Sequence, residues 1–169
     1  MRGLLDRAYD VAAYLAAVCL IGLLAMVLLS IAGRLFHFFV PGTDAYAGYL
    51  MAACGFLALA HTLKRGEHIR VTLLLARLRG RLRYGVELWA LAVTAILAAV
   101  FAWFSLRLVW QSWVFKDVST GTDATPLWIP QLAMAAGACL FAVALIDECI
   151  GQLRRRRAPH MPAEALRNE

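Results

Sequence analysis

Histidine and cysteine are the residue types in this chain best suited to metal or redox chemistry, and there are four of each. The cysteines are Cys19, Cys54, Cys139 and Cys149. No two of them form a CxxC pair, the spacing typical of redox and zinc sites. All four lie within or at the ends of apolar stretches. We therefore interpret them as small buried residues and expect neither a disulfide nor a metal ion.

The histidines do not predict a haem site. A haem held between membrane helices needs two histidines at the same depth on facing helices. His37 follows the first apolar stretch of the chain, His61 and His68 lie around the end of the second, and His160 lies in the C-terminal tail. Ligands from opposite membrane faces cannot hold one iron. We expect no cofactor. For His61 and His68 we expect hydrogen bonds at the membrane interface.

Motifs that mark enzymes are absent from the sequence. The chain has no Gly-rich phosphate loop, no HExxH, no GxSxG and no carboxylates paired at a useful spacing. An enzyme acting on lipids is disfavoured, because no nucleophile–base pair or metal cluster is visible. We expect a protein without catalytic activity.

Apolar composition decides the fold class. The 169 residues are 62% hydrophobic and 17% charged, whereas soluble domains are about 25% charged. Four stretches lack Asp, Glu, Lys and Arg, namely 11–33, 45–63, 88–106 and 126–146. Roughly 20 apolar residues in a helix cross the hydrocarbon core. The sequence predicts an all-α integral membrane protein, with one domain over 1–153 and spans at about 10–33, 44–63, 86–108 and 127–150.

Basic residues predict the orientation. Of the 17 Lys and Arg residues, 14 lie on one side of a four-span chain. The positive-inside rule places this side in the cytoplasm, so both termini are expected there. The net charge of +6 therefore indicates membrane topology and no nucleic acid. Residues 154–169, which begin with four arginines, are expected to form a disordered cytoplasmic tail.

The segment between the second and third spans carries a basic amphipathic pattern. From Arg70 to Arg83, leucines and a valine recur at helical spacing while arginines occupy another face. This favours a helix lying in the inner interface, with its arginines near anionic lipids of the inner leaflet. The alternative is a plain positively charged loop that contains leucines.

Ionisable residues are expected near the ends of the spans. Carriers of charged solutes normally place ionisable residues or broken helices near mid-bilayer, and these spans show neither. We therefore infer that the chain is an accessory subunit of another membrane protein rather than a carrier by itself. Gly48, Ala52 and Gly55 share one helix face, as do Ala133 and Gly137. Such small-residue faces allow close helix contact, either within this subunit or with a partner.

The segment from Gly33 to Leu75 resembles a known family. Gly33-Arg34 ends the first span, Pro41 lies in a short loop, and Asp44 opens the second span. The run Lys64-Arg65-Gly66-Glu67-His68-Ile69-Arg70-Val71 is similar to an Arg-x-Gly-x-His-Ile-x-Val signature after span two. These features resemble the small membrane subunit (DctQ type) of tripartite ATP-independent periplasmic (TRAP) transporters.

The resemblance implies a function and partners. A periplasmic solute-binding protein would deliver an organic anion, such as a carboxylate, to a large membrane subunit that carries the substrate and sodium sites. The small subunit would brace the large one in the bacterial inner membrane without hydrolysing ATP. The alternative hypothesis is a membrane-anchor subunit of a redox complex, which would need haem or quinone ligands.

The resemblance also implies roles for single residues. Arg34 and Asp44 would hold the outer end of the hairpin made by the first two spans, as a contact to a partner. The alternative is a snorkelling arginine with a helix N-cap at Thr43 or Asp44. Gly66, His68 and Arg70 would fix the turn that leaves the second span.

Overall fold

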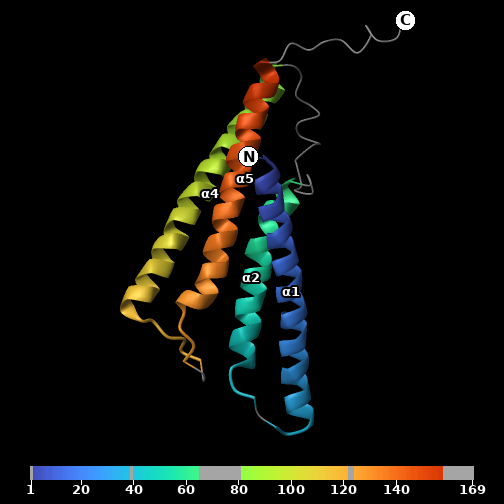
Figure 1. Cartoon of the computed structure of the whole chain (residues 1–169), viewed down its shortest axis with the longest axis vertical. Helices are drawn as coiled ribbons and strands as arrows, with labels where there is room; N and C mark the ends of the chain where they lie inside the picture. The colour runs from blue at the N-terminus through green and yellow to red at the C-terminus, as the bar shows by residue number, and fades with distance from the viewer. Residues whose placement is uncertain (1, 39, 65–80, 122–123, 158–169) are drawn as a thin grey trace, which may run out of the picture.

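Four long helices make up most of the described part of the chain. The computed structural model describes residues 2–38, 40–64, 81–121 and 124–157. In chain order, the helices are α1 (Arg2–Leu35), α2 (Thr43–Lys64), α4 (Arg81–Phe115) and α5 (Trp128–Arg157) (Figure 1). Each is long and apolar enough to cross a membrane. The predicted all-α fold with four potential spans is thus confirmed. The interfacial helix predicted between spans two and three falls mainly on residues 65–80, outside the described residues.

The helix α4 extends beyond the end expected from the sequence, at residue 108. It continues to Phe115, because six of the seven residues from 109 to 115 are apolar, aromatic or small. Arg107, which precedes this run, is itself a good helix former. Arg107 therefore precedes the last residue of α4 by eight positions, which is about 12 Å along the helix axis. Arg107 thus lies inside the helix rather than at its end.

The helices pack in one row. The main contacts join α1 to α2, α2 to α5, and α5 to α4, and Figure 1 shows this order across the molecule. The edge helices α1 and α4 consequently leave large apolar side chains uncovered, such as Ile21 at 68% and Ile96 at 63% exposed. Apolar exposure on this scale suits a protein surrounded by lipid or by membrane partners.

Alanines form most of the contact surface between the helices. The α4–α5 contact buries Ala95, Ala98, Ala102, Ala138, Ala142 and Leu145. Near the start of α1, Tyr9 packs with Ala60 of α2 and Ala144 of α5. Small side chains let helix backbones approach closely, which is how helices associate in a medium as apolar as their own side chains.

The closest approach joins α2 and α5 at Gly137. A Cβ atom at this position would lie 2.5 Å from the backbone carbon and oxygen of Phe56. No side chain fits there, so glycine is required. The small-residue face of the fourth span is therefore packed inside the subunit.

Two helices end with residues in the left-handed backbone region. The amide of Phe38 donates to the carbonyl of Gly33 (3.0 Å), with His37 at a φ of 57°. A Cβ on Gly33 would lie 2.7 Å from the Phe38 oxygen, which explains the glycine. The amide of Asp117 likewise donates to the backbone carbonyl of Ser112 (3.1 Å). These six-residue closures satisfy carbonyl groups that a helix end leaves free.

The start of α2 differs from the predicted N-cap. The carbonyl of Gly42 accepts the bond from the Tyr46 amide (3.0 Å), so Gly42, at a φ of 85°, occupies the N-cap position. Thr43 and Asp44 then lie in the first turn. An acid in the first turn still stabilises the positive end of the helix.

Replacing Gly137 by leucine should destabilise the isolated subunit. The added side chain meets backbone rather than a flexible side chain, so the α2–α5 contact must separate at a cost of about 3 kcal/mol or more. Thermal unfolding of the purified chain in detergent measures this as a lower melting temperature. Gly85→Leu is the matched control, because a Cβ at Gly85 meets nothing within 4 Å. Equal melting temperatures for the two variants would show that the α2–α5 crossing is wrong.

Candidate subunit interface

The small-residue stripe of α2 is open. Gly48, Ala52 and Gly55 are exposed, and Met51 on the same side is 67% exposed. A Cβ at Gly48 or Gly55 would meet nothing within 4 Å. Within the described part of the chain, no other helix packs on this stripe. The small-residue faces of α5 and α2 have the same sequence pattern but opposite environments. The α5 face is buried against α2 at Gly137, whereas the α2 stripe is uncovered.

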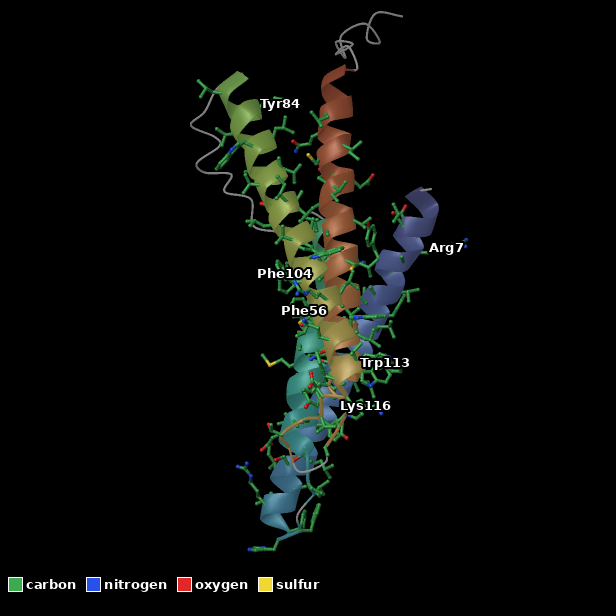
Figure 2. All side chains as sticks on the ribbon, turned by 90° about the vertical axis from the view of Figure 1, so that its left-hand side faces the viewer. Arg7, Phe56, Tyr84, Phe104, Trp113 and Lys116 are labelled. Carbon is green, nitrogen blue, oxygen red and sulfur yellow. The ribbon has the colours of Figure 1, made fainter. Side chains whose placement is uncertain are left out.

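The open stripe continues onto α4. Phe56, which follows Gly55, stacks on Phe101 of α4 with ring centroids 5.7 Å apart and an interplanar angle of 14°. Figure 2 looks along the row of helices, and α4 there overlaps α2 at the level of the labelled Phe56 and Phe104. The stacked rings thus join the exposed sides of the two helices into one surface.

A cavity of about 580 Å³ opens on the α4 part of this surface. It is lined by Phe101, Phe104, Ser105, Arg107, Leu108, Gln111 and Met134. Met134 is its contribution from α5, while the other residues belong to α4. We call the whole surface the α2–α4 face, consisting of Gly48, Met51, Ala52, Gly55, Phe56, Phe101, Phe104, Arg107, Leu108 and Gln111. It is mainly apolar, with one guanidinium and one amide.

A second cavity lies at the tip of the α1–α2 hairpin. It has a volume of about 310 Å³ and is lined by both Arg34 and Asp44, together with His37 and Ser30. The Ser30 hydroxyl donates to Asp44 Oδ1 at 3.5 Å. Both Arg34 and Asp44 are exposed, and no ion pair joins them among the described residues. The structure therefore brings the two predicted residues to one pocket.

Two tyrosines tie α2 to the loop between α4 and α5. The Tyr49 hydroxyl donates to Ser119 Oγ at 2.8 Å, and the Tyr46 and Thr125 hydroxyls lie 3.1 Å apart. This contact is not predicted from the sequence. Two tyrosines three residues apart at the start of an apolar helix were its only signal, and their partners lie 70 or more residues away.

The histidines that the structure describes lie at opposite ends of the hairpin. His37 follows α1 at the tip, whereas His61 Nδ1 is 3.6 Å from Asp10 Oδ1 near the other end. These two cannot ligate one metal ion. The part of the chain that is described contains no group of three or more potential metal ligands. Gly66, His68 and Arg70 lie outside the described residues.

Fold and surface together define a multi-pass helical membrane subunit with an uncovered face. Residues 23–155 match the family model described as tripartite ATP-independent periplasmic transporters, DctQ component. This match covers more than half of the chain, so the protein belongs to the DctQ family, the small permease component of TRAP transporters. The family implies a bacterial inner-membrane location and association with a large membrane subunit and a periplasmic binding protein. A search of curated proteins gave no match.

Removing the Tyr49 hydroxyl should loosen the α4–α5 loop. Tyr49→Phe deletes one hydrogen bond, worth about 1 kcal/mol, and leaves the ring packing in place. Hydrogen exchange at residues 117–121 should become several-fold faster. Tyr14→Phe is the control, since Tyr14 is 75% exposed and lies on α1, away from this loop. Exchange that is as slow in Tyr49→Phe as in the control would contradict a stabilising role for this bond.

Proposed function

We propose that this chain is the non-catalytic small permease subunit that braces the large membrane subunit of a TRAP transporter. The transporter would take up an organic anion, a carboxylate, with sodium, after delivery by the periplasmic binding protein. The observation that carries the proposal is the α2 stripe, whose Gly48 and Gly55 meet nothing within 4 Å. Glycine in a lipid-facing helix stabilises little by itself, but it allows a partner helix to approach closely.

The arrangement of the helices supports a bracing role rather than solute conduction. As far as the chain is described, its four helices stand in one row and enclose no interior, and the two cavities open at the surface. A polar path through the membrane must be walled off from lipid on all sides. The route for solute and sodium is therefore assigned to the large subunit.

The distribution of basic residues supports the orientation that we propose. Tyr9, Ala60 and Ala144 pack together. The start of α1 and the last parts of α2 and α5 therefore lie at the same end of the helices along their length. Fourteen of the 17 basic residues belong to the segments that lead to or from this end. We assign it to the cytoplasm, next to anionic lipids of the inner leaflet.

The hairpin tip is then on the periplasmic side. Its open cavity presents Arg34, His37 and Asp44. Exposed charges of both signs at a membrane surface are suited to contact with a polar protein surface. We assign Arg34 and Asp44 to contact with the large subunit or the binding protein.

Leucine at Gly48 or Gly55 should weaken assembly with the large subunit. Each substitution adds bulk where a partner helix approaches, at a cost of about 1–3 kcal/mol, or about tenfold in retained partner. The measurement is the amount of large subunit that co-purifies with the tagged chain in mild detergent.

Gly85→Leu is the control for this experiment. Gly85 is also exposed and open, but it lies near the start of α4, away from the stripe. Equal co-purification with wild type, both stripe variants and the control would refute the assigned interface. An absence of the large subunit from the wild-type preparation would refute the bracing role itself.

A further inference from the structure

Arg107 is an ionisable residue inside a helix that is long and apolar enough to cross a membrane. It lies in the apolar window that runs from Tyr84 to Phe115, eight residues before the end of α4. Its side chain is exposed, and it forms no ion pair with any described residue. An arginine within a membrane-spanning helix normally pairs with an anion or reaches the membrane surface, because an unpaired charge in hydrocarbon is costly.

The direction of the Cα–Cβ bond favours an anion toward the middle of α4 over one beyond its end. In a helix, the Cα–Cβ bond points toward the N-terminus. For Arg107, this direction leads away from the end of α4 at which Trp113 and Trp128 meet, 4.9 Å apart. The pocket around Arg107 includes Phe101 and Phe104, which lie further toward the centre of the span.

We infer that Arg107, with Gln111, binds a carboxylate side chain on a membrane helix of the large subunit. The inference rests on the proposed function. Gln111 lies one turn beyond Arg107 and lines the same cavity, so its amide can donate beside the guanidinium. The planar guanidinium matches a carboxylate with two parallel hydrogen bonds. Phe104 and Leu108 supply apolar walls for the helix that carries the acid.

Continuity with the α2 stripe supports a single occupant. The cavity includes Phe101, whose ring stacks on Phe56, the neighbour of Gly55. A partner helix bundle that covers the α2 stripe therefore reaches the Arg107 cavity along an unbroken surface. The carboxylate would fix the position and rotation of the partner along the otherwise apolar face.

Assembly of the full complex tests this inference. Arg107→Leu removes the charge and keeps apolar bulk, and we expect the co-purifying large subunit to fall about tenfold. Arg107→Lys keeps the charge but loses the paired donors, so we expect an intermediate loss. Lys116→Asn is the control, because it removes a nearby exposed cation outside the cavity, and asparagine tolerates the φ of 54° at this position.

A cross-link identifies the partner group. A benzophenone amino acid at Phe104 should cross-link to a membrane segment of the large subunit that contains Asp or Glu. The same photoreactive residue at Ile146, which is exposed on α5, should give no such product. Replacing the identified acid by its amide should reduce assembly as far as Arg107→Leu does, and the double variant should lose no more.

The outcomes separate the two proposals. Full retention of the large subunit by Arg107→Leu would overturn the inference and leave the bracing role intact. Loss of a bound phospholipid from Arg107→Leu in native mass spectrometry, with assembly unchanged, would overturn it in favour of a lipid site. Absence of the large subunit from the wild-type preparation would instead refute the proposed function, and the inference with it.

Discussion

The close approach of α2 and α5 at Gly137 is the contact on which the arrangement depends. With backbone atoms of Phe56 only 2.5 Å from the position of a Cβ, the glycine side of α5 must face α2, which restricts the rotation of the two helices relative to each other. This rotation leaves the alanine side of α5 for α4 and another side of α2 for α1. It also turns Gly48, Ala52 and Gly55 outward. The exposure of the α2 stripe therefore follows from the close contact between α2 and α5.

Much of the fold follows from the sequence, because hydrocarbon imposes a simple rule on helix length and composition. The four potential spans and the DctQ relationship were both predictable from it. Which small-residue face is buried was not. Gly137 and Gly55 stand in similar patterns, and only the packing of distant helices distinguishes their environments. The end of α4 was also missed, because a charged residue does not end a helix when the residues after it remain apolar.

A row of helices suits a bracing subunit better than a compact bundle does. A bundle buries its apolar surface against itself, whereas a row leaves long faces for a neighbour. The α2–α4 face is largely apolar and small on α2, and it carries one guanidinium on α4. Apolar contact would provide most of the area buried against the large subunit. A single charge in a medium of low dielectric constant would fix the position of the large subunit along this face. Arg107 is an ionisable group away from the ends of its helix, and it lies on the face that we assign to the partner.

The central claim is that the large subunit covers the α2–α4 face, and the oxygen accessibility of a spin label tests it most directly. The label would be attached to Met51→Cys in a chain whose four native cysteines are replaced by alanine, and reconstituted with and without the large subunit. A second label at Ile146→Cys reports on exposed α5. The account predicts that oxygen reaches both labels in the chain alone, and that accessibility falls at position 51 only when the large subunit is present. Equal accessibility at position 51 in the two preparations would contradict it.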